Sequence, residues 1–298
     1  MQTILGASGQ IGRTLALALK RDFTSDLRLV SRNPQKVHAS DQLLAADLLD
    51  ATQTRRAVEG STIAYLTAGL PMDTQRWVAE WPVMMRNVLD ACAAQGCKLV
   101  FFDNTYMYPQ TAQPQTEQTP FAPHGTKGQV RAAITRQLLE AIAQQRVQGM
   151  VCRAPEFYGP GKTQSITNTT LIEPLKRGGK ARVLVRDDTL RSLIYTPDAS
   201  RAMARLGNTP DAYGQTWHLP CDDARLTYRE WVALAAEIFG TQARYTVLKP
   251  WQLWLAGLVS RRMADAAELL PRYTADNIFV SDKFKQRFPD FEVTSYRQ

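Results

Sequence analysis

Three glycines at a fixed spacing stand near the start of the chain. They form a G-x-x-G-x-x-G pattern at Gly6, Gly9 and Gly12. The pattern follows Thr3–Leu5, which predicts a strand, and lies at the start of Gln10–Arg21, which predicts an amphipathic helix. Residues without side chains allow a tight turn and let an anion reach the N–H groups of the helix N-terminus, where the helix dipole favours negative charge. The sequence therefore predicts a turn that binds the pyrophosphate of a dinucleotide, against the alternative of a tight turn without a ligand.

Strand and helix patterns alternate through the first half of the chain. Further strands are expected at Leu27–Val30, Leu43–Ala46, Ile63–Thr67, Lys98–Phe102 and Gly149–Arg153, and further helices at Thr52–Val58, Pro82–Gln95 and His124–Gln145. This order is typical of a parallel sheet with helices on both faces. We predict an α/β, doubly wound Rossmann domain over residues 1–160, to which the chain returns near residues 192–220, and a smaller C-terminal substrate lobe over residues 161–298.

The regular alternation ends after Gly159. In the second half, Thr227 and Glu230 have the spacing of a capping box and open a predicted helix that ends at Phe239. Residues 249–267 are apolar and contain two tryptophans, which predicts one long helix that packs against a large surface.

Charge and composition exclude several classes of protein. The 298 residues include 36 Lys and Arg against 28 Asp and Glu, a net charge of +8, and 44% hydrophobic residues. These values are typical of a globular protein. The basic residues form no long block in either half, so we expect no nucleic-acid partner.

The cysteines and the apolar segments bear on the cellular compartment. Cys92, Cys97, Cys152 and Cys221 contain no C-x-x-C pair and lie in or beside apolar runs, so we expect reduced, buried thiols and no metal site. No run of about 18 apolar residues is present, and no charged leader precedes the first strand. We therefore expect a cytoplasmic protein without a membrane partner.

The residues after the second predicted strand indicate which dinucleotide binds. Val30–Asn33 contains Arg32, and no acid occurs before Asp41. An acid would accept hydrogen bonds from a ribose 2′-hydroxyl, whereas an arginine would neutralise a 2′-phosphate. The sequence favours NADP(H) over NAD(H) as the cofactor, and the alternative is that Arg32 is an ordinary surface residue.

Other cofactor contacts are expected at the ends of the neighbouring strands. Asp47 and Leu48 follow the third strand and are expected to meet the adenine, although Asp47 is equally well explained as an exposed loop acid. Thr67 and Ala68 follow the fourth strand, on the nicotinamide side. The residues expected to contact the cofactor at the turn itself are Gly6, Ser8, Gly9, Gln10, Ile11 and Gly12.

Four further segments carry a resemblance that covers almost the whole chain. They are Asn87–Cys92, Phe157–Gly161, Arg191–Ala199 and Val280–Phe284. Together with the glycine turn, they resemble the extended short-chain dehydrogenase/reductase superfamily, in particular its NAD-dependent epimerase/dehydratase branch. The resemblance implies that Tyr158 and Arg191 contact the substrate. It also implies a homodimer through the apolar faces of the long helices at 82–95 and 124–145, unless the sheet covers those faces completely.

The expected catalytic residues depart from those of this superfamily. Its members usually hold a Ser or Thr after the fifth strand, where this chain, counted back from Tyr108, has Asn104 followed by Thr105. An Asn amide still donates a hydrogen bond to a carbonyl oxygen. Tyr106 and Tyr108 are substitute proton donors, or aromatic packing residues.

The Y-x-x-x-K pair of the superfamily is absent. His124 stands where the Tyr is expected, and Lys127 follows three residues later. Residues three apart share a helix face, so both side chains are able to meet at one point, where a neutral His would transfer a proton. The alternative is that His124 contacts solvent and Lys127 only holds the cofactor ribose.

Two functions are compatible with these residues. One is a nicotinamide-dependent oxidoreductase or epimerase that acts on a small carbonyl or hydroxyl compound, with sugar-linked compounds among the candidates; we favour net reduction. The other is a dinucleotide-binding sensor that has lost catalysis. The polar residues retained at the expected site favour the enzyme. They are Asp103, Asn104, Tyr108, His124, Lys127 and Arg191.

Overall fold

A seven-stranded sheet forms the centre of the computed structural model, which describes residues 1–161 and 165–298. The strands follow the order β11-β6-β5-β4-β1-β2-β3, and every pair is parallel. They are β1 (Gln2–Leu5), β2 (Leu27–Ser31), β3 (Gln42–Ala45), β4 (Ile63–Leu66), β5 (Lys98–Asp103), β6 (Gly149–Arg153) and β11 (Thr216–His218). The strand order reverses between β1 and β4, which is where doubly wound sheets open a crevice at the carboxyl ends of their strands. The predicted α/β, doubly wound fold is confirmed.

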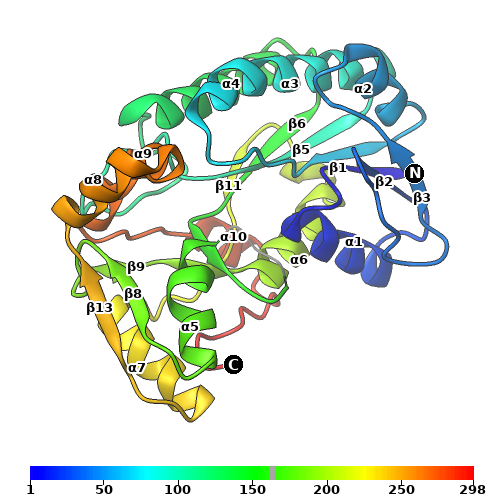
Figure 1. The fold of residues 1–298 in the computed structure, drawn as a ribbon. Helices are drawn as coiled ribbons and strands as arrows, with labels where there is room; N and C mark the ends of the chain where they lie inside the picture. The colour runs from blue at the N-terminus through cyan, green and yellow to red at the C-terminus, as the bar shows by residue number, and fades with distance from the viewer. Residues whose placement is uncertain (162–164) are drawn as a thin grey trace.

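Helices cover both faces of this sheet (Figure 1). On one face, α2 (Ala51–Val58), α3 (Thr74–Gln95) and α4 (Gly125–Ala143) share a hydrophobic core with the strands. On the other face, α1 (Gln10–Asp22) and α6 (Thr196–Gly207) form a second core. Because α6 and β11 come from beyond residue 190, the chain completes the sheet and its cover after it has entered the second lobe.

The second lobe contains short strand pairs and helices around its own core (Figure 1). The strand pairs are β7 (Glu156–Tyr158) with β10 (Leu193–Tyr195), β9 (Leu190–Arg191) with β12 (Leu226–Thr227), and β8 (Ala181–Leu184) with β13 (Tyr245–Leu248). Its helices and helical turns are η1 (Asn168–Ile172), α5 (Glu173–Lys176), α7 (Tyr228–Phe239), α8 (Pro250–Val259), α9 (Arg261–Ala267) and η3 (Leu270–Tyr273). Two further elements, η2 (Pro210–Ala212) and α10 (Asp282–Arg287), pack in the core that contains α1 and α6. None of the helices within the described residues is long and apolar enough to cross a membrane.

Helix α3 begins earlier than its sequence pattern predicts. It starts at Thr74, not at Pro82, because the Asp73 carboxylate caps it by accepting a hydrogen bond from the backbone N–H of Arg76 at 3.0 Å. Pro82 lies inside the helix, where Trp81 is buried. The free energy gained by burying this tryptophan offsets the loss of the backbone hydrogen bond that a proline cannot make.

The predicted helix over residues 249–267 is wrong in two respects. The chain forms two helices, separated at Ser260, whose hydroxyl caps α9 by accepting from the N–H of Met263. The outer side chains of α8 do not pack against a large surface of this chain but face solvent. Elsewhere the local patterns are confirmed: Thr227 and Glu230 form the predicted capping box at the start of α7, and all four cysteines are free and buried.

Candidate functional site

The turn between β1 and α1 leaves no room for side chains at two of its glycines. Gly6 has a φ of +99°, and a Cβ there would lie 2.4 Å from the backbone nitrogen of Ala68, at the end of β4. A Cβ on Gly12 would lie 2.6 Å from the carbonyl oxygen of Gly6. Both contacts are with backbone, so these two glycines are required for the turn to pack between β1 and β4.

The N-terminus of α1 is open to a ligand. Gly9 is the N-cap residue, is exposed, and provides no side chain to accept from the first N–H groups of the helix. The first turn also contains no acidic residue. Uncapped N–H groups together with the helix dipole form an anion site. The neighbouring side chains are already engaged, because Ser8 contacts Ser31 at 2.7 Å and Gln10 donates to the carbonyl oxygen of Pro160 at 2.9 Å.

The first acidic residue after β2, Asp41, binds groups of the protein itself. Asp41 is buried, and its carboxylate accepts hydrogen bonds from the backbone N–H groups of Val37 at 2.9 Å and His38 at 2.6 Å and pairs with Lys20 at 3.3 Å. Arg32 lies at the end of β2 and is exposed. The charged side chain nearest in sequence to the end of β2 is therefore a cation.

The other residues expected at the cofactor occupy the neighbouring strand ends. Asp47 is half-buried and accepts from the N–H of Leu49 at 3.0 Å. Leu48 and Ile11 are buried in the two cores. Thr67 donates to the carbonyl oxygen of Leu5 at 3.2 Å, which joins the ends of β4 and β1.

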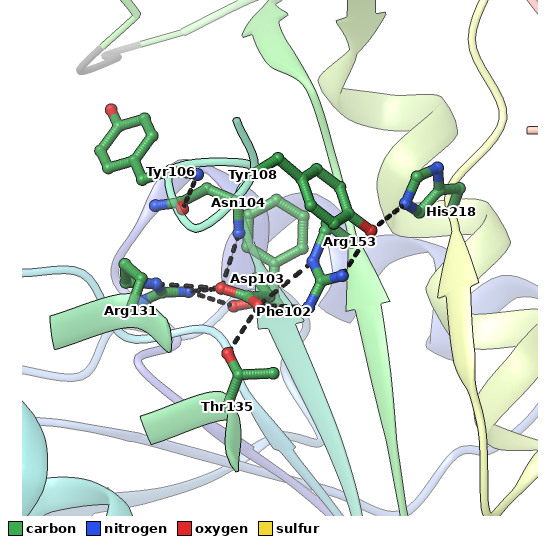
Figure 2. Close-up of polar contacts among 9 residues, drawn as sticks. All are labelled: Phe102, Asp103, Asn104, Tyr106, Tyr108, Arg131, Thr135, Arg153 and His218. Atoms are coloured by element: carbon green, nitrogen blue, oxygen red, sulfur yellow. Dashed lines mark hydrogen bonds and ion pairs between the residues drawn. The ribbon is translucent and has the colours of Figure 1, made fainter. Parts of the chain in front are cut away.

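A buried carboxylate at the end of β5 organises the polar residues behind the site (Figure 2). Asp103 accepts from Arg131 Nε at 2.9 Å, from Thr135 Oγ1 at 2.9 Å and from Arg153 Nη2 at 3.2 Å. Both arginines are buried with it. Two guanidinium groups thus share one carboxylate, and the loop after β5 begins from this cluster, since Asp103 also accepts from the N–H of Asn104 at 2.8 Å.

Tyr108 belongs to the same buried network. Its hydroxyl accepts from Arg153 Nη1 at 2.6 Å and lies 2.7 Å from His218 Nε2 (Figure 2). Because His218 Nδ1 donates to the carbonyl oxygen of Val280 at 2.7 Å, Nε2 is the acceptor and the Tyr108 hydroxyl donates to it. Burial raises the pKa of Tyr108. The structure therefore places the Tyr108 proton against an internal histidine.

The buried His218 should make the stability of the fold sensitive to acid. Burial, followed by the charge of Arg153, lowers its pKa from 6.5 to about 3, so the folded protein holds a neutral imidazole. The unfolded chain binds this proton below about pH 6.5, so stability should fall as the pH drops from there towards about 3. We expect a loss of about 2 kcal/mol in the free energy of unfolding between neutral pH and about pH 5 from this residue.

Urea unfolding across this pH range measures the effect, and His218→Gln is the variant to compare. The variant is less stable at neutral pH because it alters the bonds to Tyr108 and Val280. Its stability should nevertheless change less between pH 7 and about pH 5 than that of the native protein. Equal slopes for the two proteins would contradict the assignment of this acid sensitivity to His218.

The side chains of Asn104 and Tyr106 lie outside this network, and each has a hydrogen-bond donor without a partner among the described residues. The Asn104 Oδ1 atom accepts from the N–H of Tyr106 at 2.9 Å, which orients the amide so that its NH2 group has no partner among the described residues. The Tyr106 ring stacks on Trp77, with centroids 6.0 Å apart, and the Arg272 guanidinium lies over it at 4.6 Å. Its hydroxyl has no hydrogen-bond partner within residues 1–161 and 165–298, and burial raises its pKa. Both side chains are half-buried.

Thr105 and a small pocket lie beside this pair. Thr105 accepts from Arg272 Nη2 at 2.9 Å. Both residues line a small pocket, whose other walls include Gln110 and Gln115 in the loop after β5 and Asn277 after η3. The pocket thus lies where the sheet domain meets the second lobe.

His124 and Lys127 stand in different environments at the start of α4. His124 is the N-cap residue, is exposed, and makes no capping hydrogen bond. Lys127 is fully buried, and its Nζ donates to Thr74 Oγ1 at 2.5 Å, to the carbonyl oxygen of Asp265 at 2.7 Å and to Glu268 Oε2 at 3.2 Å. These three acceptors use all the donors of an ammonium group. The contacts to Asp265 and Glu268 join the start of α4 to the α9 segment.

The expected substrate residues lie in the core of the second lobe. Arg191 is fully buried, donates to the carbonyl oxygen of Arg272 at 2.7 Å and pairs with Glu156 at 3.3 Å. Tyr158 is half-buried and packs on Trp231, with ring centroids 5.2 Å apart. Sequence reasoning missed Glu156, Glu268 and Arg272, because each acts through a partner distant in sequence and stands in no motif.

The strand order and the glycine turn define a Rossmann-fold protein, and the candidate site lies at the carboxyl ends of the strands. The chain belongs to the NAD dependent epimerase/dehydratase family, whose model matches residues 3–219. Comparison with curated protein sequences finds no match.

Solved structures of low sequence identity share the fold over nearly the full chain. UDP-glucose 4-epimerase of Thermus thermophilus, in complex with NAD, is 16% identical with a TM-score of 0.79, covering 100% of this chain and 96% of that one. UDP-glucuronic acid 4-epimerase of Bacillus cereus, with UDP-glucuronic acid and NAD, is 15% identical with a TM-score of 0.81 and coverage of 100% and 96%. The dTDP-glucose 4,6-dehydratase of Streptomyces venezuelae is 15% identical with a TM-score of 0.76 and coverage of 99% and 92%.

Proposed function

We propose that this protein is an NADP(H)-dependent oxidoreductase that reduces a small carbonyl compound. The observation that carries the proposal is the pair of free donors on one turn after β5, the Asn104 amide and the Tyr106 hydroxyl. Family membership and the NAD-bound epimerases of the same fold support a nicotinamide cofactor. The sugar nucleotide held by one of them makes a sugar-linked carbonyl compound our first candidate substrate.

The protein's own residues fit a dinucleotide phosphate. The uncapped N–H groups after Gly9 would hold the pyrophosphate, and Gly6 and Gly12 shape the turn. The exposed Arg32 would neutralise a ribose 2′-phosphate. Asp41 is buried and bound by Val37, His38 and Lys20, so we do not expect it to select a 2′-hydroxyl. When bound, the nicotinamide supplies the hydride for reduction.

Asn104 and Tyr106 supply the polar contacts to the substrate carbonyl. The Asn104 NH2 group donates a hydrogen bond to the carbonyl oxygen and polarises it. Tyr106 transfers its hydroxyl proton to the same oxygen as the carbonyl is reduced to an alcohol. Burial raises the pKa of this hydroxyl and so opposes the transfer, while the charge of Arg272 lowers the pKa and favours it. The Arg272 guanidinium over the ring stabilises the phenolate left behind, which solvent then reprotonates.

A sensor without catalysis is the second candidate, and the position of Lys127 favours it. Its ammonium is bound by three acceptors of the chain itself, so it is unavailable to a cofactor ribose or to a proton donor unless α9 moves. A sensor binds the cofactor without turnover, and a partner protein reads the bound state.

Cofactor titration followed by a substrate screen distinguishes the two. Purified protein is titrated with NADPH and NADH by fluorescence, and a panel of carbonyl compounds is then screened by nicotinamide absorbance. We expect tighter binding of NADPH, an affinity for NADPH that falls in Arg32→Glu while that for NADH does not, and oxidation of NADPH by at least one carbonyl compound.

Tyrosine variants then test the proton donor. Tyr106→Phe should lower kcat about 100-fold, within the range typical of a lost general acid, and leave NADPH affinity unchanged. Tyr245→Phe, which removes a hydroxyl bonded to Asp187 in the second lobe, is the matched control and should retain full activity. Tight NADPH binding with no turnover of any compound would contradict the enzyme proposal and support the sensor proposal. Failure to bind either nucleotide would refute both proposals.

A further inference from the structure

Helix α8 presents a stripe of large apolar side chains to solvent. Its members are Trp251 (63% exposed), Trp254 (62%), Leu255 (46%), Leu258 (65%) and Val259 (88%). The spacing of three and four residues places all five on one face of the helix. Leu253, on the opposite face, is 5% exposed and belongs to the core of the second lobe. We call these five residues the tryptophan stripe.

The tryptophan stripe is unusual for this molecule. The other large apolar side chains that are exposed within the described residues are single residues on separate elements, except for Met263 in the adjoining α9. Scattered exposed apolar residues are normal, whereas a contiguous set marks a surface that binds something. The remaining tryptophans, Trp77, Trp81, Trp217 and Trp231, are all buried.

Positive charge flanks the tryptophan stripe at both ends. Lys249 precedes α8 and Arg261 follows it, and both are exposed. The sequence from 238 to 264 contains four basic residues and no acidic one. An apolar stripe with tryptophans and flanking cations is complementary to a surface whose outer layer is negatively charged and whose interior is apolar.

We propose that the tryptophan stripe docks this protein onto an anionic lipid membrane. Trp251 and Trp254 would enter the interface between headgroups and acyl chains, where an aromatic ring with one polar atom is favoured. Lys249 and Arg261 would contact the lipid phosphates. The helix lies in the plane of the membrane and does not cross it, since its 10 residues are half the length that a span requires.

Charge also argues against a second copy of this chain as the occupant. A symmetric dimer brings the same patch of both chains together. Antiparallel pairing of two α8 helices would set Lys249 against Arg261 of the other chain, and parallel pairing would set each cation against its own copy. Both arrangements place like charges at the rim, whereas anionic lipid neutralises them.

Vesicle binding of the native protein tests the proposal directly. The protein is sedimented with vesicles of phosphatidylcholine alone or of phosphatidylcholine with phosphatidylglycerol, and tryptophan fluorescence is recorded with brominated phosphatidylglycerol in the second set. We expect co-sedimentation with the anionic vesicles only, and quenching by the brominated lipid. Since the other tryptophans are buried, quenching reports on Trp251 and Trp254.

Variants of exposed residues separate a membrane from other partners. The double variant W251S/W254S should lower vesicle affinity by about tenfold or more. The double variant K249E/R261E should lower it by a similar factor. High salt should have the same effect on the native protein, because it screens the attraction to the lipid phosphates. Val78→Ser, at an exposed apolar residue on α3, is the matched control and should bind normally. Absence of binding to anionic vesicles would overturn the proposal. It would also be overturned if the native protein were a dimer without lipid and W251S/W254S converted that dimer to a monomer.

Discussion

Replacing Asp103 by Asn should lower the free energy of unfolding by about 3–5 kcal/mol, the cost typical of removing one partner from a buried ion pair. Asn preserves the shape of the side chain but leaves Arg131 and Arg153 buried without a counter-charge. Arg153 also donates to Tyr108, so the change should spread to the loop after β5. Urea unfolding at neutral pH, followed by circular dichroism, measures the effect.

Two companion variants isolate the charge. Thr135→Val removes one hydrogen bond to Asp103 and retains the charge, so it should cost about 1 kcal/mol. Asp188→Asn breaks an exposed pair with Arg186 and should leave the unfolding midpoint unchanged within error. If D103N were no less stable than T135V, the account of two arginines held by one carboxylate would be wrong.

Alanine at Gly12 should damage both the fold and the cofactor site, whereas alanine at Gly9 should damage only the second. A Cβ on Gly12 meets the carbonyl oxygen of Gly6 and, at 2.8 Å, the Cα of Ala7, so backbone must shift at a cost of about 1–3 kcal/mol. A Cβ on Gly9 has only the Gly6 oxygen near it, at 3.4 Å, and its φ of −74° suits any residue. We therefore expect Gly9→Ala to keep its stability within about 0.5 kcal/mol.

Thermal unfolding and NADPH titration of the two variants separate these effects. The added methyl of Gly9→Ala lies where the proposed pyrophosphate approaches the helix, so NADPH affinity should fall by about tenfold or more. Gly12→Ala should show both a lower Tm and weaker binding. Native affinity in Gly9→Ala would place the cofactor phosphates away from this turn and contradict the proposed site.

The sequence by itself determined the sheet domain. Gly6 and Gly12 are signals of local backbone geometry. The strands β1 and β4 on either side of this turn in the sheet are buried at every residue, so their apolar runs are continuous and easy to read. The caps of helices are local as well, which is why the Thr227–Glu230 capping box was predicted correctly. The early start of α3 was missed because Pro82 is tolerated inside it only through tertiary burial of its neighbours.

Only the tertiary structure distinguished residues that look equivalent in sequence. Tyr106 and Tyr108 stand two residues apart, yet one hydroxyl faces Arg153 and His218 while the other has no partner among the described residues. Lys127 is occupied by α9, which no local pattern connects to α4. The outward face of α8 was likewise decided by tertiary contacts, because apolar periodicity shows that a helix has an apolar face but not whether protein or another surface covers it.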